Sequence, residues 1–207
     1  MQIILSKYAG FCYGADLAYK IPERLVKEGK YPIYMLGEIV HNKGVVNKLE
    51  RAGVKTIENL NEITDKNGIL LIRAHGTTQE ILDKAKKRGL KIADATCPNV
   101  KKAHQLAKFL LKNKYKVVLL GDKGHDEVLS IASSVGNDLI IIESEGEAEK
   151  LPDFPKIGFL SQTTQSQKKF KKIAEILKKK TKDIKIFNTI CQDASDRQKE
   201  VKNLAEA

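Results

Sequence analysis

Short apolar runs alternate with amphipathic segments along the whole chain. Eight runs have the length and the aliphatic content that buried β-strands need. They are Gln2–Leu5, Tyr31–Leu36, Gly68–Arg73, Lys91–Ala93, Lys116–Leu120, Asp138–Ile142, Lys156–Leu160 and Lys185–Phe187. Between most of them, apolar residues recur at helical spacing, as in Leu17–Lys27, Thr78–Lys87, Val100–Leu111 and Lys168–Lys179. This alternation predicts an α/β fold with small, mainly parallel sheets covered by helices.

The same short motifs occur twice in the same order, which indicates an internal repeat. A Leu-Gly pair, with a histidine four residues after the glycine, occurs at Leu36–His41 and again at Leu120–His125. A Thr-Thr-Gln motif then follows a predicted strand at 77–79 and at 163–165. In both copies a further strand leads into a cysteine. Each unit is expected to contain three strands, and every strand is expected to follow a helix.

The cysteines mark the boundaries of these units. We predict a first α/β lobe over residues 1–96, a second over 97–190 and the beginning of a third over 191–207. The strand expected in residues 1–5 belongs either to the first lobe or to the sheet of the third. The expected architecture is a pseudo-threefold assembly of βα lobes, with two complete lobes and a third whose greater part is absent from this chain.

The composition is that of an ordinary globular protein, with 42% hydrophobic and 30% charged residues. The net charge of +11 is compatible with nucleic-acid binding. Most lysines, however, lie in helical stretches such as Lys101–Lys116, where a solvated helix face explains them. No apolar run approaches the length of a membrane helix, and the N-terminus does not resemble a signal peptide. We therefore predict a cytoplasmic protein that binds neither nucleic acid nor membrane.

Ligands of open α/β sheets bind beyond the carboxyl ends of the strands. Polar residues follow the predicted strand ends at Cys12, His41, His75, Cys97, His125, Thr163 and Cys191. Three lobes around a pseudo-threefold axis would bring the three cysteines to one centre. Structural zinc normally takes four ligands from closely spaced pairs, whereas three isolated thiolates suit an iron–sulfur cluster with one open iron. Each cysteine taken singly could also be a small buried hydrophobe.

The histidines and one glutamate are the candidates for substrate chemistry. His41 and His125 lie in equivalent loops and His75 at another strand end, where they could donate hydrogen bonds to an anion such as a diphosphate. His104 lies within a predicted helix and favours a surface or packing role. Glu127 is a candidate proton carrier, although a glutamate that favours the start of a helix is the other interpretation.

Taken together, the ordered motifs resemble those of the 4-hydroxy-3-methylbut-2-enyl diphosphate reductase family, which acts last in the non-mevalonate isoprenoid pathway. The motifs are Gly10-Phe11-Cys12-Tyr13-Gly14, Val40-His41-Asn42, Ala74-His75-Gly76, Asp94-Ala95-Thr96-Cys97-Pro98, Gly124-His125-Asp126-Glu127-Val128, Gln162-Thr163-Thr164, and Cys191 followed by Arg197-Gln198. The resemblance covers essentially the whole chain.

The resemblance implies a [4Fe–4S] cluster on Cys12, Cys97 and Cys191, with the substrate oxygen at the open iron. It implies reductive removal of the hydroxyl of (E)-4-hydroxy-3-methylbut-2-enyl diphosphate with two electrons and two protons. The products would be isopentenyl and dimethylallyl diphosphates, and a ferredoxin or flavodoxin would supply the electrons.

The resemblance also implies residue roles. His41, His75 and His125 would contact the diphosphate and hydroxyl regions of the substrate. Glu127 would pass a proton to the leaving hydroxyl, and Thr163 would hold the hydroxyl network in place. Glu127, Thr163 and His125 are therefore the predicted catalytic residues.

Two departures from the family pattern affect the substrate pocket. The family often has a threonine shortly after the third cysteine, whereas this chain has Asp193-Ala194-Ser195, so that Ser195 is expected to bind substrate in its place. A Ser-x-Asn motif and a later serine belong to the third lobe, and without them the chain is expected to bind substrate weakly or not at all. A metal-binding or redox-sensing module without turnover, and a basic nucleic-acid-binding protein, are the alternative functions.

Overall fold

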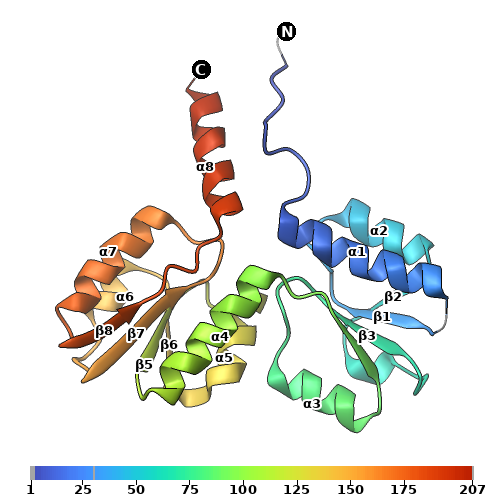
Figure 1. The fold of residues 1–207 in the computed structure, drawn as a ribbon, viewed down its shortest axis with the longest axis horizontal. Coiled ribbons are helices and arrows are strands. Elements are labelled where there is room, and N and C mark those ends of the chain that lie inside the picture. Colours follow the sequence, from blue (N-terminus) through green and yellow to red (C-terminus); the bar gives the residue numbers. More distant parts are fainter. Residues whose placement is uncertain (1–2, 30, 207) are drawn as a thin grey trace. The chain divides into compact units, whose positions relative to one another are not determined.

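The computed structural model describes residues 3–29 and 31–206 (Figure 1). The chain divides into two compact units. We call Tyr13–Lys101 the first unit, and Met1–Cys12 together with Lys102–Ala207 the second unit. Both are α/β structures in which every strand pairing is parallel, which confirms the predicted fold class.

The first unit is a four-stranded sheet with the strand order β2-β1-β3-β4. Its elements are α1 (Tyr13–Glu28), β1 (Ile33–Leu36), α2 (Lys43–Arg51), β2 (Val54–Ile57), η1 (Leu60–Glu62), β3 (Ile69–Ile72), α3 (Gln79–Lys87) and β4 (Lys91–Asp94). Because successive side chains of a strand point to opposite faces, Ile33 and Met35 pack with α1 and α2, whereas Tyr34 packs with α3 and η1. Figure 1 shows these helices on the two sides of the sheet.

The second unit repeats this topology with the strand order β6-β5-β7-β8. Its elements are α4 (Pro98–Lys112) from Lys102 onward, β5 (Lys116–Leu120), α5 (Asp126–Val135), η2 (Gly136–Asp138), β6 (Leu139–Ile142), α6 (Glu145–Glu149), β7 (Lys156–Ser161), α7 (Gln167–Lys178), β8 (Asp183–Ile186) and α8 (Gln192–Ala205). Val118 and Phe159 pack with α6 and α7 on one face of the sheet. Val117 and Leu160 pack with α4 and α5 on the other.

Equivalent hydrogen bonds show how closely the two units correspond. Gly37 donates its N–H to the carbonyl of Ile57 at 2.9 Å, and Gly121 donates to that of Ile142 at 3.0 Å. In each unit the glycine that follows the first strand is thereby tied to the end of the neighbouring edge strand. The predicted internal repeat is confirmed, but each unit has four strands among its described residues where the repeat predicted three. The additional strand is the edge strand of each sheet, of which β6 matches the predicted run Asp138–Ile142 and β2 matches none.

Three strand predictions need correction. Residues 3–5 form no strand, and Ile3 and Leu5 are 80% and 83% exposed, because no described segment pairs with them. The remainder of the strand expected in residues 1–5 lies outside the described residues. β2 was missed because it is an edge strand in which only Val54 and Ile57 are buried. β8 begins two residues before its predicted start at Lys185 and is half-buried throughout. The division into three lobes stays a prediction.

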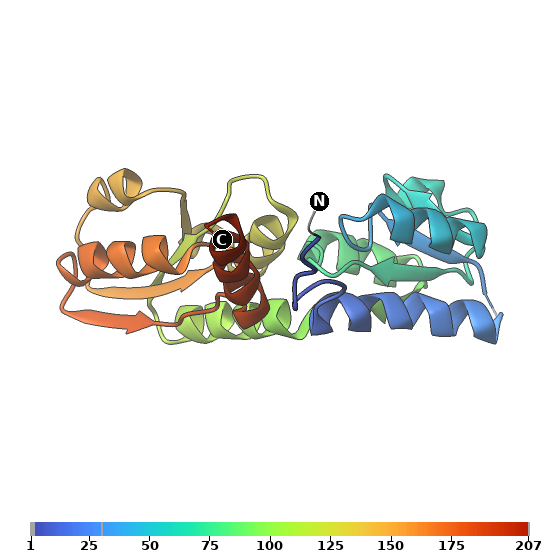
Figure 2. The ribbon, with the colours of Figure 1, turned by 90° about the horizontal axis from the view of Figure 1, so that it is seen from above.

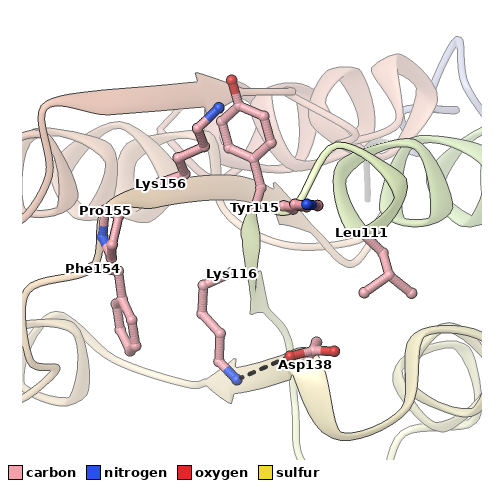
Figure 3. A pocket seen from close by; sticks show the side chains of 8 residues that line it. Leu111, Tyr115, Lys116, Asp138, Phe154, Pro155 and Lys156 are labelled. Carbon is pink, nitrogen blue, oxygen red and sulfur yellow. Dashed lines mark ion pairs between the residues drawn. The ribbon is translucent and has the colours of Figure 1, made fainter.

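A pocket of about 360 Å³ lies at the amino-terminal ends of β5 and β7 (Figure 3). Its lining consists of Leu111, Lys114, Tyr115, Lys116, Asp138, Phe154, Pro155 and Lys156. Lys116 reaches across it to Asp138, with 3.9 Å between the ammonium and the carboxylate. No predicted site residue lines this pocket, and the carboxyl ends of the strands, where α/β sheets bind ligands, lie at the opposite edge. No helix in the described part of the chain is long and apolar enough to cross a membrane.

Candidate active site

Glu127 is a buried carboxylate, and both of its oxygens accept hydrogen bonds from Thr163. It lies in the first turn of α5 and is 1% exposed. Thr163, in the loop after β7, donates its backbone N–H to Glu127 Oε1 and its hydroxyl to Oε2, both at 2.8 Å. Burial raises the pKa of Glu127 to about 7, against the opposing effect of the two hydrogen bonds from Thr163. A carboxyl group with a pKa near neutrality can both donate and accept a proton at physiological pH.

His125 caps the same helix. Its ring Nδ1 accepts a hydrogen bond of 3.1 Å from the backbone N–H of Glu127. In the neutral ring this contact leaves the proton on Nε2, which is then a hydrogen-bond donor. His125 is half-buried, so one side chain can stabilise the start of α5 and offer a donor to a ligand.

Gln162 organises the loops around Glu127 and was not predicted as a site residue. It is 1% exposed, accepts a hydrogen bond of 2.9 Å from the backbone N–H of Asp122, and donates one of 2.9 Å to the hydroxyl of Thr164. Gln162 and α5 can lie close to this loop because residue 121 is glycine: a Cβ there would lie 2.5 Å from a methyl group of Val128 and 3.2 Å from Gln162 Oε1. The position of this amide shortly after a predicted strand, in the motif Gln162-Thr163-Thr164, was the available signal in the sequence.

Cys191 is hydrogen-bonded to the loop after β7, to which Glu127 is also bonded. Its backbone N–H donates to the carbonyl of Thr163 at 2.7 Å. Nearby, the hydroxyl of Thr189 accepts a hydrogen bond of 2.9 Å from the backbone N–H of Ser161, which fixes the segment before the cysteine. Thr163 therefore connects a predicted cluster ligand with the predicted proton carrier.

Cys97 has the corresponding anchor in the first unit. Its N–H donates to the carbonyl of Ala74 at 2.9 Å, and Ala74, like Thr163, lies two residues after its strand ends. Gly14 in α1 lies directly against Cys97, because a Cβ at this position would overlap the sulfur. Only glycine allows α1 to pass so close to this thiol.

The three cysteines share one local setting. Each is half-buried, each lies outside any disulfide bond, and each directly precedes a helix, namely α1, α4 or α8. The start of a helix carries partial positive charge and unpaired N–H groups, which stabilise negative ligands such as thiolates. Soft thiolates in such a setting fit an iron–sulfur cluster.

The remaining candidates lie at strand ends or on α8. His41 and His75 stack in the first unit, with ring centroids 4.6 Å apart and an angle of 25° between the rings. His41 Nδ1 also lies 3.5 Å from Glu38 Oε2. Ser195 lies in the first turn of α8, where its hydroxyl accepts from the side-chain amide of Gln167 at 3.5 Å.

His104 has the packing role expected for it. Its Nε2 lies 3.0 Å from the hydroxyl of Ser130, a residue of α5 that is 1% exposed. This contact joins α4 and α5 within the core of the second unit.

Residues 3–207 match the family model described as LytB protein. The chain belongs to the LytB family. A relative from Geobacter metallireducens is 44% identical over 206 residues, which are 99% of this chain and 72% of the relative. One from Syntrophotalea carbinolica is 43% identical over 99% of this chain and 73% of the relative. Both are named 4-hydroxy-3-methylbut-2-enyl diphosphate reductase.

Solved structures of LytB reductases share the fold. The E-1-hydroxy-2-methyl-but-2-enyl-4-diphosphate reductase from Plasmodium falciparum superposes with a TM-score of 0.87 and 36% identity, over 94% of this chain and 62% of that one. A second structure, of (E)-4-hydroxy-3-methyl-but-2-enyl diphosphate reductase, gives a TM-score of 0.82 and 37% identity over 98% of this chain and 73% of that one. The family resemblance, and with it membership in a family of oxidoreductases of isoprenoid biosynthesis, is confirmed.

Proposed function

We propose that this LytB chain supplies the cluster ligands and the proton carrier of a reductase acting on (E)-4-hydroxy-3-methylbut-2-enyl diphosphate. Two electrons and two protons would remove the allylic hydroxyl as water and give isopentenyl and dimethylallyl diphosphates. The observation that carries the proposal is the double role of Thr163, which binds the carboxylate of Glu127 and anchors Cys191. Proton supply and electron supply would then be organised by one loop.

Cys12, Cys97 and Cys191 would hold the [4Fe–4S] cluster through their thiolates. Bound there, the cluster would supply electrons and a Lewis-acidic position for the departing hydroxyl. The chain contributes the three helix starts that stabilise negative charge, and the backbone anchors at Ala74 and Thr163 that fix two of the cysteines.

Glu127 would protonate the leaving hydroxyl, because hydroxide is a poor leaving group and water a good one. With a pKa of about 7, a large share of Glu127 carries a proton at neutral pH. Thr163 would hold the carboxyl group in one orientation and place its hydroxyl beside the reacting oxygen.

The histidines would bind the polar parts of the substrate. His125 would donate from Nε2, since Nδ1 is occupied by the backbone of α5. His41 and His75, which already stack on one another, would contact the diphosphate, and Ser195 would complete the contacts from α8. The positive charge of the chain favours an acidic electron donor such as a ferredoxin or flavodoxin.

Anaerobic reconstitution of the chain with iron and sulfide tests this function. We expect a brown protein whose absorption spectrum and iron content indicate a [4Fe–4S] cluster. Turnover with reduced ferredoxin should be detectable and slower than that of the longer Geobacter metallireducens relative. Cys97→Ser should lose the cluster, whereas Glu127→Gln should keep the cluster and lose turnover.

The outcomes separate the alternatives. A cluster without any turnover or substrate binding would be the result expected of a redox-sensing module, and also of a reductase chain without the third-lobe contacts. A colourless protein that binds RNA in a strongly salt-dependent way would indicate a nucleic-acid-binding protein. Full iron content in Cys97→Ser would count against the assigned ligands.

A further inference from the structure

One carboxylate ties the segment that leads to Cys12 to helix α8. Glu200 Oε1 accepts a hydrogen bond of 3.0 Å from the backbone N–H of Lys7, and Oε2 accepts one of 3.4 Å from that of Tyr8. The hydroxyl of Ser6 also donates to Oε2. Figures 1 and 2 show the N-terminal segment beside α8. Three donors from consecutive residues thus meet a single side chain that is more than 190 positions away in sequence.

A second contact lies closer to the cysteine. Arg197 donates from Nη2 to the carbonyl of Gly10 at 3.1 Å, two residues before Cys12. Gly10 has a φ of 97°, a left-handed conformation that glycine adopts without strain, so the chain can turn sharply two residues before Cys12. Arg197 and Glu200 are three residues apart on α8 and therefore lie on the same face of the helix. We call these two residues the α8 clamp.

The other end of α8 is fixed at Cys191. The helix starts directly after this cysteine, whose N–H is bonded to the carbonyl of Thr163. Arg197 is six residues further on, which places it about 9 Å along the helix axis from Cys191. A helix over this distance is a rigid spacer, so that the α8 clamp relates the backbone before Cys12 to the backbone at Cys191.

Apolar packing contributes little to holding α8 and the N-terminal segment in place. α8 has no buried residue among those described, and Ile3, Ile4 and Leu5 are 80%, 57% and 83% exposed. The position of the segment therefore depends strongly on directed polar contacts. The hydrogen bond from Ser6, with those from the N–H groups of Lys7 and Tyr8, lowers the pKa of Glu200, so that it is charged at neutral pH.

We propose that Glu200 and Arg197 are positioning residues that set the place of Cys12 relative to Cys191 and so preorganise two of the three cluster thiolates. This inference rests on the proposed function, because it assumes that these cysteines hold a cluster. It gives Arg197, which in the sequence is only part of a family motif, a role in positioning Cys12.

The first test uses the chain without a cluster. Hydrogen–deuterium exchange of the amide of Lys7 should be roughly three- to tenfold faster in Glu200→Ala than in the wild type, because its charge-assisted hydrogen bond is lost. The amide of Tyr8 should change less, because it also donates to the hydroxyl of Ser6 at 3.1 Å. Glu206→Ala is the matched control, since Glu206 is an exposed carboxylate directly after the last residue of α8, and its side chain pairs with Lys202 at 3.7 Å. Arg197→Met should accelerate exchange at residues 10–12 in the same way.

The second test measures the cluster. After reconstitution, the half-life of the cluster absorbance in air should be roughly three- to tenfold shorter in Glu200→Ala and in Arg197→Met, and unchanged in Glu206→Ala. Glu200→Gln, which keeps one acceptor oxygen, should lie between the wild type and Glu200→Ala.

Faster exchange with an unchanged cluster half-life would overturn the inference, because the contacts would then hold the segment without serving the cluster. Unchanged exchange in Glu200→Ala would overturn it as well. A wild type that takes up no cluster under any condition would instead contradict the proposed function. The exchange data would then still show whether Glu200 and Arg197 hold the segment before Cys12.

Discussion

Thr163 donates both its backbone N–H and its hydroxyl to the two carboxylate oxygens of Glu127, each at 2.8 Å. The pair is buried, and it joins the loop after β7 to the first turn of α5. Burial disfavours the charged form of Glu127, whereas the hydrogen bonds favour it. The resulting pKa of about 7 is a balance of these two effects, and each can be altered separately.

Thr163→Val should raise the pKa of Glu127 further, because the substitution removes one hydrogen bond to the carboxylate and leaves the burial unchanged. The charged form of Glu127 would also lose a partner, at a cost of about 1–3 kcal/mol in the free energy of unfolding above neutral pH. Denaturant unfolding at pH 8 measures this loss. Thr163→Ser keeps the hydroxyl and should behave as the wild type, whereas a Thr163→Val variant as stable as the wild type would show that the hydroxyl bond to Glu127 adds nothing to stability.

The free energy of unfolding should fall as the pH rises from about 4.5 to about 7, because of the titration of Glu127. In this range the folded protein retains the proton of Glu127, whereas the unfolded chain, with the ordinary pKa of 4.5, has lost it. Folding then becomes less favourable as pH rises, by up to about 3 kcal/mol across the interval. Unfolding of the wild type and of Glu127→Gln, measured from pH 5 to pH 8, should show this slope only in the wild type.

The same titration should appear in turnover. If Glu127 gives its proton to the leaving hydroxyl, the rate should decline as pH rises through about 7, since the protonated form is depleted. A rate that stays flat from pH 6 to pH 8.5, at saturating substrate and with an intact cluster, would contradict the assignment of Glu127 as the proton donor.

The sequence predicted the repeat and the strand-end position of most site residues because both follow from local pattern. Glu127 was left with two interpretations, a helix-start glutamate and a proton carrier. The structure shows it in the first turn of α5 and also buried against Thr163, a contact across 36 residues that periodicity cannot reveal. Likewise, the cap made by His125 depends on the backbone conformation at residue 125, which the sequence does not specify.

The errors have a similar cause. Ile3, Ile4 and Leu5 have the composition of a strand, but a strand forms only where another strand is available to pair with it. Val54–Ile57 shows the reverse case. Its two central residues are polar, so it was not predicted as a strand, yet β1 pairs with it along its whole length. Composition predicts a central strand well because both faces are buried, and it predicts an edge strand poorly.

Gly14→Ala should damage the cluster site. The added methyl group would overlap the sulfur of Cys97, so that either α1 or the thiol must move. We expect incomplete cluster uptake, measured as iron per chain after reconstitution. Gly146→Ala is the matched control, because Gly146 is also helical and a Cβ there meets nothing within 4 Å. It should keep full iron content and gain about 0.5–1 kcal/mol in stability.

Two substitutions of His125 can separate its role as a helix cap from its role as a hydrogen-bond donor to the substrate. His125→Ala should lose both the cap, worth about 1 kcal/mol of stability, and the donor at Nε2. His125→Asn should restore the cap, because asparagine is among the preferred residues at this position, but not a donor at the place of Nε2. We therefore expect His125→Asn to unfold at the denaturant concentration of the wild type and to have a raised KM for the diphosphate substrate. If the asparagine variant recovers stability and KM together, His125 serves only the helix, and substrate contact must be assigned elsewhere.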